Sequence, residues 1–409
     1  METTTFCPMD FWVPLEAKGE TTEPGRPLSG HGFRPRRERR LLSQPRFQEA
    51  KALCFHIRRG NPTRVLSSPA WNRANQQHGS FGSCPASIIA AQKEWQLRFL
   101  QQPDDFYFNH LRKGLLKSRT VVKSLINADS VDEVSLIDNA TTAAAIVLQQ
   151  IGRAFAQGKF QKGDVVVMLH CAFQSVKKSI QAYVTGAGGS VIEVQLPFPL
   201  TSKEEIVSEF RKGLEKGKSD GRHVRQEGVD QVFVDAAHAI GSVPVDVKEI
   251  GADFYGQGIT VHSLLFLQFL EFVNRFEGGI EGIMMRNHEI VVKMGEMLAK
   301  SWGTNLGAPP EMCASMIMVG LPSRLFISSE EDAMRLRSYL RQHHGIEVPL
   351  HYQAPSDVEG GPKDKDGLVT GYARISHQVY NSFDDYCKFR DAINQLVEQR
   401  RSCKMLFME

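Results

Sequence analysis

The sequence predicts an α/β protein, with a large domain built on a mainly parallel sheet and a smaller α/β domain at its C-terminal end. Between residues 106 and 234, short apolar runs of strand length alternate with segments whose apolar residues recur at helical spacing. This alternation is typical of a parallel sheet covered by helices. The 409 residues are too many for one small core, and 42% hydrophobic with 23% charged residues is ordinary for a globular protein.

The large domain is expected to contain eight elements, each bounded by turn or cap residues. The strands are expected at 133–137, 165–169, 191–196 and 231–234. One helix precedes each strand: the first ends near Asn127, the second is opened by 138–142, and the fourth spans 203–216. The third helix, between the strands at 165–169 and 191–196, carries Phe173, Val176, Ile180 and Tyr183 on one side. Asx and Thr residues stand where the second helix needs its N-cap.

The C-terminal third is expected to form the smaller α/β unit. Its elements are a strand at 316–320, a helix at 330–343 closed by Gly345, strands at 347–352 and 369–376, and a final helix. Ser382 with Asp385 resembles a capping box at the start of that helix. We therefore predict an N-terminal region at 1–73, a large domain at 74–272 and a small domain at 273–409.

The N-terminal region, residues 1–73, is expected to be mostly disordered and basic. It is rich in Pro, Gly, Ser and Arg without sustained periodicity, and residues 26–73 hold a local charge of +10 against +3 for the whole chain. The cluster RPRRERR at 34–40 admits a nuclear-localisation or nucleic-acid role, but no aromatic residues are interleaved with it. A solvated basic tail is the expected explanation, and nucleic acid is not an expected partner.

Cysteine usage and hydropathy limit the cellular locations expected for this protein. The seven cysteines form no CxxC pair, which argues against a disulfide framework and a metal site. The longest strongly apolar stretch, 261–270, is about half of a bilayer span, so no membrane helix is expected. We expect a cytoplasmic protein. Mitochondrial or plastid import is the alternative, although the first 23 residues contain acids that transit peptides avoid.

Thr141 and Thr142 are the first candidate ligand-binding residues. They stand where a strand end runs into a helix N-terminus, and there free N–H groups, the helix dipole and two hydroxyls can hold a phosphate. The alternative is that these threonines only cap the helix.

Asp235 is the second candidate, in the run VFVDAAHAIG at 232–241. A carboxylate at the carboxyl end of a buried parallel strand lies where open α/β sheets bind ligands. It needs a cationic partner there, and a protonated pyridine nitrogen would serve. The alternative is that Asp235 caps the next turn.

Arg374 is the third candidate, because an arginine between apolar strand residues is costly to bury without an anion. Its planar guanidinium suits a substrate carboxylate, although a structural Asp or Glu could take the same place. Together, the phosphate site, the acid and the carboxylate clamp suggest a phosphorylated heteroaromatic cofactor acting on an amino acid.

Longer runs around these residues resemble one family. The sequence is similar to the class-V aminotransferase superfamily of fold type I pyridoxal-phosphate (PLP) enzymes, and within it to plant L-cysteine desulfhydrases and isopenicillin N epimerase-like proteins. The resemblance covers about 79–403. It is carried by DAAHAIGSVPVDVKEIGADFY at 235–255, NATTAA at 139–144, HCAFQSVKK at 170–178 and RISHQVYN at 374–381.

The resemblance implies an aspartate aminotransferase-like large domain and a set of roles. Thr141 and Thr142 would bind the PLP phosphate, and His170 and Phe173 would flank the pyridine ring. Asp235 would hold the ring nitrogen protonated, and His238 would contact the phenolic oxygen. Arg374 would bind the substrate carboxylate, and Gly79, Ser80 and Phe81 would belong to the N-terminal active-site segment. L-cysteine or a related amino acid is the implied substrate, and a homodimer is possible.

The chain departs from the family pattern after Tyr255. There the family continues within a few residues to an Asn-x-His-Lys-Trp motif that contains the Schiff-base lysine, whereas this sequence has no lysine between Lys248 and Lys293. Deletions are indicated near 225–226 and 256–270, which would leave the central sheet incomplete. Skipped exons or an imperfect gene model is the expected origin of this truncated pattern.

These departures set the expected function. We expect a PLP-dependent lyase of the L-cysteine desulfhydrase type, which converts L-cysteine to sulfide, pyruvate and ammonia, with impaired turnover because no catalytic lysine is in place. PLP binding is then expected to be weak or noncovalent. The alternative is a pseudoenzyme that binds PLP noncovalently or partners an intact homologue.

Overall fold

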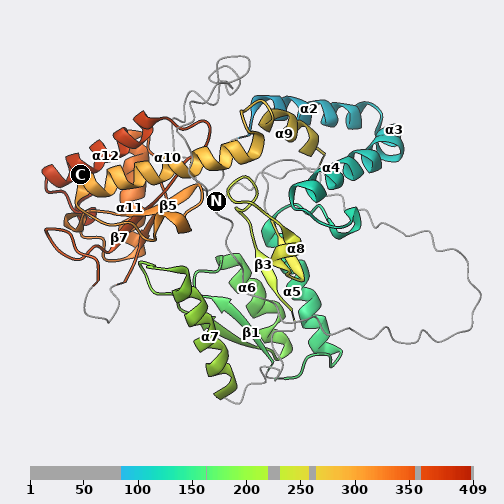
Figure 1. The fold of residues 1–409 in the computed structure, drawn as a ribbon, viewed down its shortest axis with the longest axis horizontal. Coiled ribbons are helices and arrows are strands. Elements are labelled where there is room, and N and C mark those ends of the chain that lie inside the picture. The colour runs from blue at the N-terminus through green and yellow to red at the C-terminus, as the bar shows by residue number, and fades with distance from the viewer. Residues whose placement is uncertain (1–83, 163, 220–230, 258–263, 355–360, 407–409) are drawn as a thin grey trace, which may run out of the picture. The chain divides into compact units, whose positions relative to one another are not determined.

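The structure, a computed structural model, describes residues 84–162, 164–219, 231–257, 264–354 and 361–406 (Figure 1). They form a helix-rich α/β fold, which confirms the predicted fold class. The predicted disordered region at 1–73 lies outside the described residues, and the boundary between 272 and 273 stays a prediction. Among the helices of the described ranges, none is long and apolar enough to cross a membrane.

The parallel strands of the large domain occur as two separate pairs. Strand β1 (Val165–Leu169) pairs with β2 (Ser190–Val194), and β3 (Phe233–Asp235) pairs with β4 (Phe254–Gly256). Within the described ranges no strand joins the two pairs. All five side chains of β1 are apolar yet only half-buried. The predicted parallel sheet is therefore present as two separate two-stranded pairs, and β1 is less buried than a strand inside a continuous sheet would be.

Helices α5 (Ala140–Ala156) and α6 (Gln174–Tyr183) pack against each other beside β1. Their contact is a small apolar core of Leu148, Ile180 and Val184. Helix α7 (Lys203–Ser219) packs against β2, and Gly213 allows this because a Cβ there would lie 2.6 Å from Val194 Cγ2. The candidate phosphate site lies at the N-terminal ends of α5 and α6, two helices that this core holds together.

Gly152 sets the spacing between α5 and α6. A Cβ at this position would lie 2.6 Å from the backbone oxygen of Tyr183, which cannot move without displacing α6. We expect Gly152→Ala to lower the free energy of unfolding by about 1–3 kcal/mol, as overpacking does. Urea unfolding measures this. The control is Gly186→Ala, where the nearest atom would be 3.9 Å away, and equal losses in both variants would contradict the packing argument.

A helical group contains the N-terminal described residues. It comprises α2 (Ala86–Gln101), α3 (Pro103–Asp105), α4 (Arg112–Leu125) and α9 (Phe266–Val273), with a π-helix at Phe106–Leu111 between α3 and α4. Helix α9 packs against α2 and α4, and Phe266 is buried with Val122, Ala128 and Val134. Helix α8 (Val247–Ile250) is a single turn capped by Asp246.

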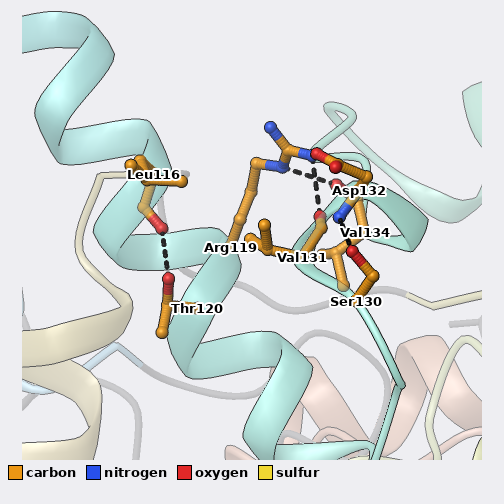
Figure 2. Close-up of polar contacts among 7 residues, drawn as sticks. All are labelled: Leu116, Arg119, Thr120, Ser130, Val131, Asp132 and Val134. Atoms are coloured by element: carbon orange, nitrogen blue, oxygen red, sulfur yellow. Dashed lines mark hydrogen bonds and ion pairs between the residues drawn. The ribbon is translucent and has the colours of Figure 1, made fainter.

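The predicted strand at 133–137 is wrong. Residues Val131–Glu133 form a 3-10 helix, and no strand follows before α5. Figure 2 shows the reason: the guanidinium of Arg119 donates to the carbonyl oxygens of Val131 at 2.7 Å and Val134 at 2.8 Å. Because these carbonyls bond to a side chain of α4, they are not available to a neighbouring strand.

The small domain is an antiparallel sheet covered by helices on one face. Its strand order is β5 (Met316–Gly320), β7 (Gly371–Ser376), β6 (Leu350–Tyr352). The main core of the molecule lies between this sheet and helices α10 (Gly279–Trp302), α11 (Glu330–Tyr339) and α12 (Phe383–Glu398). Short helices lie at Thr185–Ala187, Pro310–Met312, Ser323–Leu325, Leu340–His344 and Cys403–Met405.

Most predicted elements of the small domain are confirmed. Strand β5 has the predicted bounds, Gly345 ends its helix in the left-handed region with φ 64°, and Ser382 with Asp385 forms the capping box. Strands β6 and β7 are shorter than predicted at their N-terminal ends.

Candidate functional site

The N-terminal ends of α5 and α6 lie together. The side chain of Asn139, not that of a threonine, caps α5 by accepting from the backbone N–H of Thr142 at 2.8 Å. The Thr141 hydroxyl lies 3.0 Å from the Ser175 hydroxyl in the first turn of α6. The capping role is thus filled by Asn139, which leaves the threonine hydroxyls for other contacts.

His170 and Phe173 lie between the end of β1 and the start of α6. The Nδ1 of His170 accepts from the backbone N–H of Leu196 at 3.1 Å, so a neutral ring carries its proton on Nε2. Phe173 is 66% exposed, which is unusual for a phenylalanine and leaves its ring free to stack on a ligand.

Asp235 ends β3 at the edge where ligands bind in α/β sheets. Its carboxylate is exposed and accepts from the backbone N–H of Ala237 at 3.3 Å. This is the contact expected if Asp235 caps the next turn, the alternative to ligand binding. In the parallel register Asp235 pairs with Gly256. A Cβ on Gly256 would lie 2.9 Å from the ring of Phe233 and 3.9 Å from Ala143 Cβ, so this edge lies against the first turn of α5.

Arg374 projects from the face of the small-domain sheet opposite the main core. Ala373 and Ile375 on β7 are fully buried in that core, whereas Arg374 is half-buried and shares the other face with Tyr372. The ring of Tyr372 packs edge-on against Phe198 with centroids 4.7 Å apart. Phe198 lies two residues after Leu196, whose backbone N–H bonds to His170. The face of the sheet that carries Arg374 is therefore turned toward the segment that contacts His170.

His238 connects the two halves of the site electrostatically. Burial lowers the pKa of His238, the charge of Arg374 lowers it further, and the carboxylate of Asp235 opposes both effects. Burial also lowers the pKa of the Arg374 guanidinium, and the charge of Arg337 lowers this pKa further. His238 is therefore close enough to interact with Asp235, three residues before it, and with Arg374, which is distant in sequence.

Sequence reasoning missed a hydroxyl pair beside this site. Ser242 and Ser315 have their Oγ atoms 3.0 Å apart, which ties the turn after Asp235 to the residue preceding β5. No local pattern in the sequence indicates a contact across 73 residues. The other predicted site residues, Gly79, Ser80 and Phe81, lie outside the described residues.

Lys248 is the last lysine before the lysine-free stretch, and its amine is bound elsewhere. Its Nζ lies 2.6 Å from Asp129 Oδ1 in an ion pair, and this hydrogen bond raises the pKa of the Lys248 amine. A raised pKa favours the protonated amine, whereas a nucleophilic lysine must be neutral.

Comparison with solved structures shows which class of fold this is. A cysteine desulfurase from Thermococcus onnurineus in its apo form matches with a TM-score of 0.56 and 14% identity, covering 82% of this chain and 97% of that one. A lysine-to-alanine mutant of C-DES, with glycine covalently linked to the PLP cofactor, matches with a TM-score of 0.58 and 12% identity, covering 82% and 99%. The chain therefore has the fold of these structures, which is the fold of type I PLP enzymes.

Sequence comparison gives the family. The chain is 54% identical over 407 residues to the L-cysteine desulfhydrase of Arabidopsis thaliana, with 81% of this chain and 90% of that protein covered. It is 50% identical to a probable chloroplastic L-cysteine desulfhydrase of the same plant, with 83% and 85% covered. No family model matches. The chain belongs to the L-cysteine desulfhydrase family, as its motifs predicted.

Proposed function

We propose that this chain is a PLP-dependent lyase of the L-cysteine desulfhydrase type that holds PLP noncovalently and turns L-cysteine over at close to the background rate. The observation that carries this proposal is the combination of the candidate ligand-binding residues with a lysine-free stretch from 249 to 292. When bound, PLP acts as an electron sink that stabilises negative charge on the α-carbon of the amino acid.

The chemistry of the donor set fits PLP. Two threonine hydroxyls at the start of α5 and the adjacent Ser175 hydroxyl suit a phosphate, and the exposed Asp235 carboxylate suits a protonated pyridine nitrogen. His170 and Phe173 would flank the ring, and His238 would contact the phenolic oxygen. Arg374 would bind the carboxylate of L-cysteine or a related amino acid.

The proposal of impaired turnover rests on the lysine. Proton movement at the α-carbon needs a positioned base, and Lys248 is engaged by Asp129 on an exposed turn. The comparisons support internal loss of chain. The match to the Arabidopsis enzyme spans 407 aligned positions but only 81% of this chain, so the relative has residues that have no counterpart here.

The second candidate function is that of a pseudoenzyme. A chain in which His238 interacts electrostatically with Asp235 and Arg374, but which has no lysine from 249 to 292, could bind PLP as a regulatory partner of an intact homologue. Copurification of such a homologue would favour this function, and a homodimer remains a proposal. So does the cytoplasmic location, with plastid import as the alternative that one relative's name supports.

PLP retention tests the proposed function. In equilibrium dialysis the full chain should retain PLP, and borohydride should leave its mass unchanged because no lysine-bound cofactor is there to be fixed. Thr142→Val should weaken retention about tenfold, the cost of one hydrogen bond to a charged group. Thr120→Val is the matched control, because its hydroxyl donates to Leu116 O within α4 (Figure 2). Absence of retention, or a covalent pyridoxyl group, would overturn the proposal.

A further inference from the structure

Gln257 carries a buried amide at the edge of the candidate site. It directly follows Gly256, the last residue of β4, which pairs with Asp235. Both amide atoms, Oε1 and Nε2, are buried, and neither has a hydrogen-bond partner within the described part of the chain. An amide offers two N–H donors and one acceptor, and native proteins rarely leave all of them unused in the interior.

The surroundings of Gln257 point to a ligand. The carbonyl of the neighbouring Gly256 accepts from Ala236 N–H at 2.7 Å, which holds the end of β4 against the turn after Asp235. Helix α5 packs against β4, and the space beside Gly256 is closed by Ala143 in the first turn of that helix. Gln257 thus follows β4 at the carboxyl edge of the strands, and β4 packs against the helix that carries Thr141 and Thr142.

We propose that Gln257 is a cofactor-binding residue of this chain, whose side-chain N–H donates to a phosphate oxygen of PLP. The inference rests on the proposed function and deepens it. In a chain without a lysine to hold PLP, noncovalent donors to the phosphate must supply the affinity. Gln257 stands in the segment after Tyr255 where the chain departs from the family pattern, so its role belongs to this chain.

Gln257→Leu separates ligand binding from a structural role. Leucine removes the amide while keeping comparable bulk, and the loss of unpaired buried polar atoms should leave the melting temperature of the ligand-free protein unchanged or higher. We expect the dissociation constant for PLP to rise at least about tenfold, as for a lost hydrogen bond to a charged group. The affinity for pyridoxal, which has no phosphate, should stay at the wild-type value.

Gln268→Leu is the matched control. Gln268 lies on α9, and its Oε1 is likewise buried without a hydrogen-bond partner within the described ranges. This variant should bind PLP as the wild type does. Equilibrium dialysis with PLP and with pyridoxal, together with thermal melts of ligand-free protein, gives every value needed.

Three results would overturn the inference. The first is wild-type PLP affinity in Gln257→Leu. The second is an equal loss of PLP and pyridoxal binding together with a lower melting temperature, which is the signature of a structural role. The third is a wild-type chain that binds no PLP, and that result alone would overturn the proposed function as well.

Discussion

Purified protein supplied with PLP and L-cysteine should release sulfide about 10²–10⁴-fold more slowly than a relative with a positioned base, because this is what general acid–base catalysis contributes. The chain has no lysine from 249 to 292, and the amine of Lys248 is held protonated by its ion pair with Asp129. The Arabidopsis L-cysteine desulfhydrase, 54% identical, is the comparison protein. Sulfide release at constant PLP is the measurement.

Lys248→Met tests whether any residual turnover uses that amine. If Lys248 takes no part, the variant keeps the same slow rate and loses only an exposed ion pair, which contributes little to stability. Sulfide release at the rate of the relative, abolished by Lys248→Met, would show instead that Lys248 leaves Asp129 and serves as the base. The prediction would then be wrong.

Local signals predicted two helix ends of the C-terminal third well. Gly345 and the pair Ser382 and Asp385 end or begin helices through their own backbone and side-chain chemistry, so the nearby sequence contains the whole cause. The strand at 133–137 failed for the opposite reason. The carbonyl of Val134 within it and that of Val131 just before it bond to Arg119, a residue of a different element, and a pattern of apolar residues does not reveal this contact.

The candidate site was predicted residue by residue but not as an arrangement. Each of Thr141, Asp235 and Arg374 had a local reason to be chosen, namely a helix start, a strand end and an apolar strand interior. The interaction of His238 with Arg374 depends on the register of β7 and the turn after β3, which sequence spacing does not determine. Gln257 became visible only through the burial of its amide.

Acid should unfold the small domain through His377, which is 3% exposed. Tyr386 donates its hydroxyl to Ser376 O at 2.7 Å, so its oxygen accepts from Nδ1–H of His377 at 2.9 Å. The Nε2 atom has no partner within the described residues, and a proton there would bring an unpaired charge into the core. Burial, aided by the charge of Arg286, lowers the pKa of His377 to about 3.

The sign of the pH effect follows from where the proton binds. The unfolded chain protonates this histidine near pH 6.5 and the folded chain only near pH 3, so the unfolded state takes up the extra proton between these values. Stability is fully present above pH 6.5 and is lost as the pH falls, by at most about 1.4 kcal/mol per pH unit and about 5 kcal/mol in all. Urea unfolding between about pH 7.5 and 4.5 measures the slope.

His377→Gln should flatten that slope, because glutamine cannot take up a proton in this range, even if the variant is less stable at neutral pH. His343→Gln is the control: His343 is exposed at the end of the α11 segment, and its loss should leave the slope as in the wild type. An unchanged slope in His377→Gln would mean that water reaches the imidazole in the folded state. In that case His377, which directly follows β7 and lies three residues after Arg374, would belong to a core that opens to water rather than to a rigid support for Arg374.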